Sequence, residues 1–283
     1  MTKTSYSKLL VKTCNLHNGL KLVILYSNGG TVSKSATNRP FAVFDIDGTL
    51  LRWQFFHAIV HELGKQNLLT KGAHGNIKKA RMAWKTRTNP DSFGQYEKVL
   101  VQNYLKSLPN ITPKQHLDAE KLVYNTYKDQ LFTYTLGLIK DLSAQNYLIF
   151  AISGSPQSIV DIMAKDLGFS GAIGSFLEQK NGKYTGKITT PIFDKSAAVQ
   201  NLINTHNLSL KGSIAIGDSK SDIAMLSSVE QGIAFNPDSN LYNAALKNGW
   251  DIVIERKNVV YQLKADANKN YILQKNKGHS NAI

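Results

Sequence analysis

The sequence predicts an α/β fold in which a doubly wound, mostly parallel sheet carries a small inserted α-helical domain. Four short apolar runs each end in polar or glycine-rich residues, as buried parallel strands do. Helical patterns stand beside these runs, and strands that alternate with helices imply right-handed crossovers in one sheet. A long helical segment separates the first run from the second, which predicts the insertion.

The predicted elements of the sheet follow one another along the chain. The strands are expected at 41–47 (FAVFDID), 147–153 (YLIFAIS), 213–218 (SIAIGD) and 231–236 (QGIAFN). The helices beside them are expected at 155–169, 194–208 and 219–229. Parallel sheets of this kind bind ligands beyond the carboxyl ends of their strands, so polar residues at those ends are candidates for a site.

The insertion is expected at 55–132, between core segments 41–54 and 133–255. It shows four helical patterns, at 55–69, 75–87, 93–108 and 112–132. Over 54–132 the net charge is +6, whereas the rest of 41–255 carries −3. A basic insertion that covers an acidic site at the strand ends would suit a phosphorylated substrate. We nevertheless interpret Arg81, Lys85 and Arg87 as a solvated face, and Trp84, Phe93 and Tyr96 as packing within the insertion.

Most of the net charge of +14 lies in the two ends of the chain. Residues 1–40, which we expect to be a basic N-terminal extension of undetermined fold, carry +6, and residues 256–283 carry +5. The stretch at 21–32 has the composition of a strand that could be added to the edge of the sheet, but composition alone does not decide whether it is. We interpret 256–283 as a solvated basic tail. RNA or anionic-surface binding by these ends is a less favoured alternative.

Cysteine content and hydropathy restrict the class of protein. The single cysteine, Cys14, cannot form an intrachain disulfide, which fits a reducing cytoplasm. No stretch approaches the roughly 18 to 20 apolar residues that cross a bilayer. We therefore expect a cytoplasmic globular protein, and the sequence gives no indication of its oligomeric state.

The polar residues at the predicted strand ends form a set suited to Mg²⁺ and phosphate. Carboxylates dominate the set, and no His/Cys group has the spacing of a zinc site. A carboxylate beside Mg²⁺ is a suitable nucleophile toward phosphorus, while lysine and hydroxyl groups bind phosphate oxygens. The residues expected to converge are Asp45, Asp47, Thr49, Ser153, Gly154, Lys195, Asp218, Ser219 and Asp222.

Four motifs in this order resemble those of the haloacid dehalogenase superfamily. They are DIDGT at 45–49, ISGS at 152–155, Lys195, and GDSKSD at 217–222. The helical insertion between the first two motifs resembles the phosphoserine phosphatase-like branch of that superfamily. The resemblance spans about residues 41–255 and implies a Mg²⁺-dependent phosphatase that hydrolyses a small phosphomonoester through an aspartyl-phosphate.

The resemblance also implies a role for each matching residue. Asp45 would be the nucleophile, and Asp47 would protonate the leaving alcohol and then activate water. Phosphate would be bound by Ser153, Gly154 and Lys195. Mg²⁺ would be held by Asp45, the main-chain carbonyl of Asp47, Asp218 and Asp222.

Some alternatives stay open at this point. Asp45 and Asp47 could instead cap the helix that follows them, since Asp is a common N-cap residue. Lys187 and Lys220 are alternative candidates to Lys195 for the phosphate-binding lysine. The chain has Arg52 to Gln54 where phosphoserine phosphatases typically have an acid for the substrate amine, and Ser221 where they have Asn. The motifs also fit a phosphotransferase or a mutase.

Overall fold

The computed structural model describes residues 10–15, 21–26, 39–87, 89 and 91–274, and the chain divides into two compact units, Met1–Thr37 and Asn38–Ile283. In the first unit, β1 (Leu10–Asn15) and β2 (Lys21–Tyr26) pair in antiparallel register. The apolar stretch from residue 21 therefore forms a two-stranded sheet with β1 and does not join the large sheet as an edge strand.

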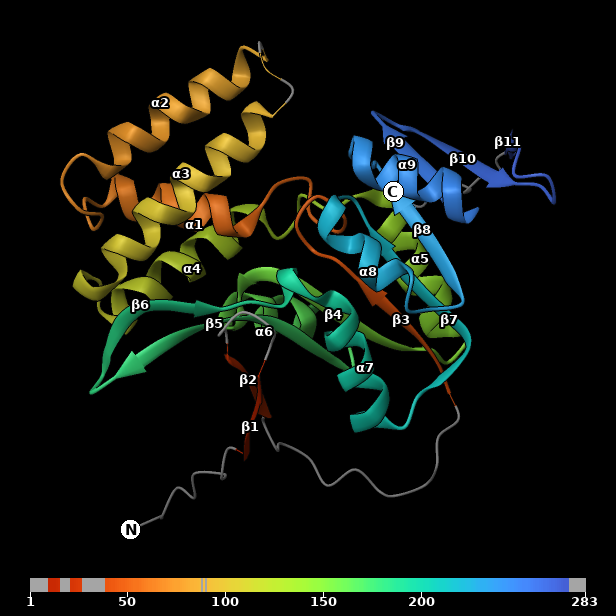
Figure 1. Ribbon diagram of the computed structural model, residues 1–283, viewed down its shortest axis with the longest axis horizontal. Coiled ribbons are helices and arrows are strands. Elements are labelled where there is room, and N and C mark those ends of the chain that lie inside the picture. Colours follow the sequence, from red (N-terminus) through yellow and green to blue (C-terminus); the bar gives the residue numbers. More distant parts are fainter. Residues whose placement is uncertain (1–9, 16–20, 27–38, 88, 90, 275–283) are drawn as a thin grey trace. The chain divides into compact units, whose positions relative to one another are not determined.

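The second unit is built on a sheet that has nine strands in the described part of the chain, in the order β11-β10-β9-β8-β7-β3-β4-β5-β6 (Figure 1). The six strands from β9 to β5 in this order are parallel, which confirms the predicted mostly parallel sheet. The strands are β3 (Pro40–Phe44), β4 (Leu148–Pro156), β5 (Gly171–Lys180), β6 (Lys183–Thr189), β7 (Ser209–Gly217), β8 (Gln231–Phe235), β9 (Asp251–Arg256), β10 (Val259–Ala265) and β11 (Tyr271–Leu273).

No helix in the described ranges combines the length and apolar character needed to span a membrane. The α-helices are α1 (Phe55–Lys65), α2 (Ala73–Lys85), α3 (Ser92–Ser107), α4 (Pro113–Tyr127), α5 (Thr133–Ala144), α6 (Gln157–Asp166), α7 (Lys195–His206), α8 (Ile223–Leu226) and α9 (Ser239–Asn248). Short 3₁₀ turns are η1 (Leu108–Asn110), η2 (Pro191–Phe193) and η3 (Lys220–Asp222).

The central strands of the sheet are buried on both faces, and alternate residues of each strand contribute to opposite faces. In β3, Ala42 and Phe44 belong to one hydrophobic cluster, together with side chains of α5 and α6. Phe41 and Val43 belong to a second cluster, together with side chains of α7, α8 and α9. Helices on both faces explain why the central strands are apolar throughout.

Helices α1 to α4 occupy most of the predicted insertion and pack on one another through aromatic rings. Trp84 of α2 stacks on Tyr96 of α3, with ring centroids 5.4 Å apart, and Phe93 packs edge-on against Trp84. This confirms the packing role expected for the three residues. The solvated face was predicted correctly for Lys85 and Arg87, which are exposed, but not for Arg81, whose Nε is buried.

The predicted tail at 256–283 is wrong for its described part. Strand β10 pairs antiparallel with β9, and β11 pairs with β10, so these residues extend one edge of the sheet. Val260 and Leu263 pack against the hydrophobic clusters, while Val259, Tyr261 and Lys264 are exposed. Strand β10 lies second from the edge of the sheet, between β9 and β11, and is only partly covered, while the Lys- and Asn-rich sequence that follows it has the composition of a loop. Residues 275–283 lie outside the described ranges.

Candidate active site

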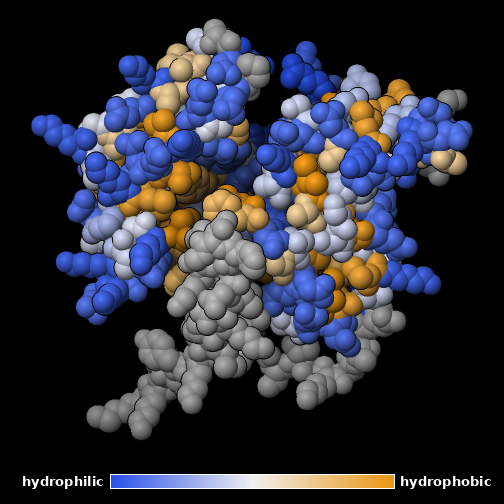
Figure 2. Space-filling model, in the orientation of Figure 1, coloured by the Kyte–Doolittle hydropathy of each residue, from blue (hydrophilic) through white to orange (hydrophobic). Residues whose placement is uncertain are grey.

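The site lies where the carboxyl ends of β4, β3 and β7 meet, because these three strands are neighbours in the sheet. Asp45 follows β3 directly, Asp218 follows β7, and Ser153 lies in β4. Asp222 comes from η3 and Lys195 from the first turn of α7. Figure 2 shows the surface hollowed between α3 and α9, where Figure 1 places the loop between β3 and α1.

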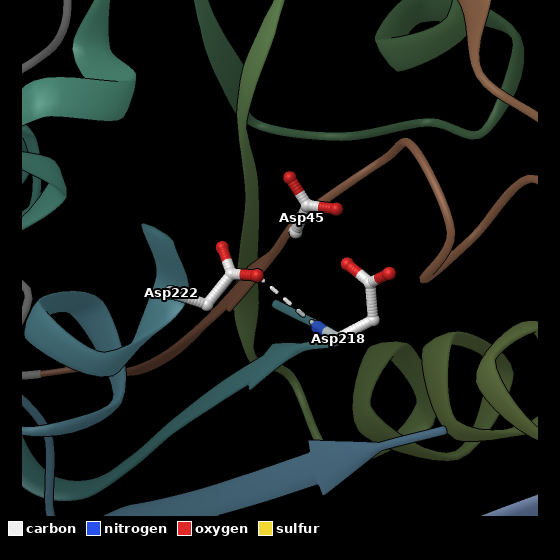
Figure 3. A group of neighbouring side chains, drawn as sticks. All are labelled: Asp45, Asp218 and Asp222. Carbon is white, nitrogen blue, oxygen red and sulfur yellow. Dashed lines mark hydrogen bonds between the residues drawn. The ribbon is translucent and has the colours of Figure 1, made fainter. Parts of the chain in front are cut away.

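Three carboxylates converge at this edge of the sheet (Figure 3). Asp45, Asp218 and Asp222 each offer an oxygen, and these oxygens lie within 4.8 Å of one another. Gly48 makes this approach possible because its φ is +93°, and a Cβ there would lie 2.2 Å from Asp218 Oδ2. A Cβ at Gly217 would lie 2.4 Å from the Asp222 side chain. Both glycines are therefore required by the acid cluster.

Lys195 is the cation that joins two of these acids. Its Nζ donates to Asp45 Oδ1 at 2.7 Å, to Asp222 Oδ1 at 2.6 Å and to the main-chain oxygen of Ile152 at 3.1 Å. The side chain is 1% exposed. Burial alone would lower the pKa of Lys195, but Asp222 and Asp45 outweigh burial and raise it, so the amine stays charged. The sequence predicts Lys195 as the phosphate-binding lysine, and in the structure it contacts Asp45, the predicted nucleophile.

Asp45 and Asp218 differ from ordinary carboxylates because they are buried next to other acids. Burial raises the pKa of Asp45 to about 7; Lys195 opposes this shift, and Asp222 and Asp47 add to it. Burial, followed by Asp45 and Asp222, raises the pKa of Asp218 well above its usual range. One lysine among three acids leaves an excess of negative charge. A divalent cation would offset it.

Asp222 also fixes the local backbone. Its Oδ2 accepts the amide hydrogens of Asp218 at 3.1 Å and Ser219 at 3.0 Å, as well as the Ser219 hydroxyl at 3.0 Å. The side chain is fully buried. Asp222 therefore caps the turn after β7 through Oδ2, while its other oxygen, Oδ1, accepts from Lys195.

The carboxylate of Asp47 lies apart from the three-acid group and is held by three donors. The main-chain nitrogen of Phe55 donates to Oδ1 at 2.6 Å, and the hydroxyls of Ser153 and Ser155 donate to Oδ2 at 2.8 and 2.7 Å. Phe55 is the first residue of α1. The N-terminus of the insertion is thus fastened to the residue expected to act as acid and base.

Ser155 is a site residue that the sequence prediction missed. It is fully buried, donates to Asp47, and accepts the main-chain hydrogen of Phe56 at 3.0 Å. Two signals in the sequence pointed to it: its place in the motif ISGS at 152–155, and its position two residues after Ser153, on the same side of β4. Its partner Phe56 lies 99 residues earlier, so the contact depends on how α1 packs on β4.

The remaining predicted residues line the same edge. Gly154 approaches η2 so closely that a Cβ would lie 2.7 Å from Ile192, and its carbonyl accepts the Ser175 hydroxyl at 2.6 Å. The Thr49 hydroxyl reaches Asp218 Oδ1 at 3.5 Å. The two substitutes for Lys195 are less suited: the Lys187 side chain is 78% exposed and pairs with Glu178 at 3.9 Å, and Lys220 is exposed.

The donor set fits a hard divalent cation. Three carboxylate oxygens lie close enough to share one ion, as Mg²⁺ sites require, and the set contains no sulfur or imidazole ligand. The fold and this site define a class of protein: a doubly wound α/β fold with acidic strand ends, a buried lysine and a helical insertion after the first strand.

The chain belongs to the haloacid dehalogenase-like hydrolase family, whose model matches residues 42–227. The match covers all four motifs and the insertion. It confirms the resemblance indicated by the sequence.

Curated relatives include several phosphoserine phosphatases. Phosphoserine phosphatase SerB1 of Mycobacterium tuberculosis is 35% identical over 107 residues, which cover 37% of this chain and 35% of that protein. The phosphoserine phosphatase of Archaeoglobus fulgidus is 26% identical over 221 residues, or 77% of this chain and 57% of that protein. The matched region thus spans about a third of the length of the first relative and over half of the second.

Solved structures share the fold. A Bordetella pertussis protein of unknown function superposes with a TM-score of 0.61 at 21% identity, covering 77% of this chain and 99% of that one. A phospho-aspartyl intermediate analogue of phosphoserine phosphatase superposes with a TM-score of 0.56 at 20% identity, covering 78% and 95%. At these identities the likeness establishes the architecture.

Proposed function

We propose that this protein is a Mg²⁺-dependent phosphatase that hydrolyses a small phosphomonoester through an aspartyl-phosphate on Asp45. The observation that carries the proposal is the arrangement around Asp45, which lies beside Lys195, Asp218 and Asp222 at the carboxyl end of β3. Family membership and phosphoserine phosphatase relatives support the same reaction class.

The positively charged and hydrogen-bonding groups of the site would bind the phosphate. Lys195 stays charged and would bind an equatorial phosphate oxygen, together with the Ser153 hydroxyl and the main chain at Gly154. We propose that Asp45, Asp218, Asp222 and the main-chain carbonyl of Asp47 hold Mg²⁺. The ion would offset the repulsion between an anionic phosphate and an attacking carboxylate.

In the first half of the reaction, Asp45 attacks phosphorus. Lys195 occupies Oδ1, so we assign the attack to Oδ2. The bond between phosphorus and the ester oxygen breaks, and Asp47 gives a proton to the departing alkoxide. Asp47 is suited to this task because Phe55, Ser153 and Ser155 orient it without drawing it into the acid cluster.

In the second half, Asp47 takes a proton from water, and the resulting hydroxide attacks phosphorus of the aspartyl-phosphate. The bond between phosphorus and Asp45 breaks, which releases inorganic phosphate and restores both carboxyl groups. Donation of the water proton to Asp47 closes the cycle, because it replaces the proton given to the alcohol.

Phosphoserine is one candidate substrate, supported by the names of the relatives. The segment after the first motif counts against it. Arg52 donates to the Leu131 carbonyl and pairs with Glu255, so it is committed to the base of the insertion. Glu62, the nearest acid, accepts from Gln66 and pairs with Lys65. We therefore propose the class of small phosphomonoesters and leave phosphoserine as one member.

Turnover of an aryl phosphate with Mg²⁺ tests the proposal. Wild type is expected to release phosphate, whereas Asp45→Asn should lose activity by at least about 10⁴-fold because the nucleophile is gone. Equal rates in the two proteins would refute the assignment. Addition of an acceptor alcohol separates hydrolysis from phosphoryl transfer, since a hydrolase forms only inorganic phosphate.

A further inference from the structure

A second cluster of charged residues lies in the helical insertion, away from the acid cluster. It lines a cavity of about 240 Å³ formed by one face of α1, by α2 and by α4, which lie together in Figure 1. We call it the insertion groove. Its ionisable residues, apart from Tyr127, are His61, Glu62, Lys65, His74, Lys78 and Arg81.

The insertion groove has an excess of positive charge. Glu62 is its only acid, and this side chain is already engaged by Lys65 at 3.5 Å and by Gln66 at 2.9 Å. Across the part of the chain that the structure describes, no carboxylate pairs with Lys78 or Arg81. Two cations therefore remain without an anionic partner.

Arg81 is arranged for a ligand and is not a simple surface charge. Its guanidinium lies 5.3 Å from the centre of the Trp53 ring, which orients it across the groove. Its Nε is buried and has no hydrogen-bond partner. A buried donor without an acceptor lowers stability. An oxyanion that accepts a hydrogen bond from the guanidinium would remove this cost, and its binding would therefore be favourable in free energy.

The two histidines add hydrogen-bonding capacity without adding charge at neutral pH. Burial, followed by the charge of Arg81, lowers the pKa of His61 to about 4. Burial and Lys78 lower the pKa of His74. His61 is held by the Tyr96 hydroxyl at 3.0 Å. The neutral rings are consistent with a positive field in the groove.

The groove begins near the catalytic loop. Phe55, the first residue of α1, donates to Asp47, and Trp53 precedes it by two residues. Ala58 and His61 line the groove from the same helix, about 4.5 and 9 Å further along its axis at a rise of about 1.5 Å per residue. The loop that carries Asp47 thus continues directly into the helix that lines the groove.

We propose that the insertion groove binds an anionic group, a carboxylate or a phosphate, on the leaving alcohol of the substrate, through Arg81 and Lys78. This inference rests on the proposed phosphatase activity and narrows its substrate class. The cavity exceeds the roughly 30 Å³ that one water occupies, so it has room for such a group. A carboxylate and a phosphate both present oxyanions to the groove, and the experiment below distinguishes between them.

Three esters on one carbon frame provide the kinetic test: propyl phosphate, 3-phosphooxypropanoate and propane-1,3-diol bisphosphate. Wild type should show a kcat/KM at least about tenfold higher for one of the two anionic esters than for propyl phosphate, which identifies carboxylate or phosphate. Arg81→Gln and Lys78→Gln should reduce this ratio toward one. Lys79→Gln is the matched control, because Lys79 is an exposed neighbour on α2 outside the groove.

Equal kcat/KM for the three esters in wild type would overturn the proposal, and so would a preference that survives Arg81→Gln. Calorimetric titration of the metal-free protein with succinate measures binding to the groove independently of catalytic activity. Wild type and Lys79→Gln should bind succinate, and Arg81→Gln should bind at least about tenfold more weakly. Absence of turnover on every ester would refute the phosphatase, whereas equal succinate binding in Arg81→Gln would refute the groove.

Discussion

The acid cluster and the insertion groove differ in how their charges are paired. At the acid cluster, Lys195 has hydrogen bonds to Asp45, Asp222 and a carbonyl, and Asp222 is bonded at both oxygens. In the insertion groove, Arg81 and Lys78 have no carboxylate partner in the described ranges. The first region is held in place by its own side chains, whereas the second presents charge to a ligand.

This difference suggests a division of tasks. A reaction step requires fixed geometry, and the buried network at the end of β3 supplies it. Choice among substrates requires groups that gain partners only when the right ligand arrives, and the groove supplies those. Loss of a charge should therefore be costly to stability in the acid cluster and of little consequence for stability in the groove.

The largest effect is expected from Lys195→Met. This change leaves Asp45 and Asp222 buried without their cation, which should lower the free energy of unfolding by about 3 kcal/mol or more at pH 8. Turnover should fall by about 10²–10³-fold because a phosphate ligand is lost. Urea denaturation and a phosphate-release assay measure the two quantities.

Lys187→Met is the control for Lys195→Met. Lys187 is 78% exposed and pairs only loosely with Glu178, so its removal should change stability by less than about 0.5 kcal/mol. Millimolar Mg²⁺ should recover part of the stability lost in Lys195→Met, since the ion offsets the same charge. A Lys195→Met protein as stable as wild type without metal would contradict the comparison.

The next effect is a pH dependence of metal binding that the groove should not share. Burial raises the pKa of Asp45 to about 7, so in metal-free protein the group holds a proton below that pH, and Mg²⁺ must displace it. The apparent affinity for Mg²⁺ should fall by up to about tenfold per pH unit from 7 downward. Asp45→Asn should bind Mg²⁺ more weakly at pH 8, with a flatter pH profile.

Calorimetric titrations with Mg²⁺ between pH 5.5 and 8 measure this profile. Succinate binding to the groove, titrated over pH 6.5 to 8, should change little, because arginine and lysine side chains as a class carry their charge throughout this range. An identical Mg²⁺ affinity at pH 5.5 and pH 8 would show that the carboxyl of Asp45 is not desolvated as described.

A smaller, selective effect is expected from Ser155→Ala. The change removes one of three donors to Asp47 and leaves the Phe56 amide without its acceptor. We expect kcat to fall by about tenfold with KM nearly unchanged, because the acid and base is misplaced while the phosphate ligands remain. The free energy of unfolding should fall by about 1 kcal/mol.

Ser213→Ala provides a matched control for Ser155→Ala. Ser213 is equally buried, donates to the Leu210 carbonyl and accepts the Glu230 amide, but it lies far from Asp47 in β7. Its loss should lower stability by a similar amount and leave kcat unchanged. Equal losses of kcat in both variants would mean that Ser155 acts only on stability.

The central fold could be predicted from the sequence, and the edges of the sheet could not. Parallel strands such as β3 and β7 are buried on both faces and appear as continuous apolar runs. Strands near the edge of a sheet are only partly covered and carry polar residues, so the region of β10 and β11 resembles a loop in composition although Leu263 packs on the core.

The same distinction applies to the site. Asp45, Asp218 and Lys195 stand in ordered motifs at strand and helix ends, so their convergence follows from the strand order. Arg81 has no such signal, and the motif that contains Ser155 does not show what Ser155 contacts, because both roles depend on how α1 packs against β4 and α2. Contacts of this kind join distant segments and are decided by tertiary packing.

The smallest effect compares the two regions through the pH dependence of stability in metal-free protein. The pKa of His61 is lowered to about 4, so between pH 6.5 and 4 the unfolded state binds more protons and stability falls as pH falls. The pKa of Asp45 is raised to about 7, so between pH 3.8 and 7 the folded state binds more protons and stability rises as pH falls. The two regions therefore have opposite slopes.

His61→Gln separates these contributions, because glutamine does not titrate and offers a donor to the Tyr96 hydroxyl. Relative to wild type, its free energy of unfolding should improve progressively from pH 6.5 to 4.5, and Asp45→Asn should show the reverse trend. The effect is modest because His61 is only partly shielded from solvent. Urea denaturation at three pH values measures it. Parallel curves for wild type and His61→Gln would place the acid sensitivity outside the groove, in another group such as His206, whose pKa burial also lowers.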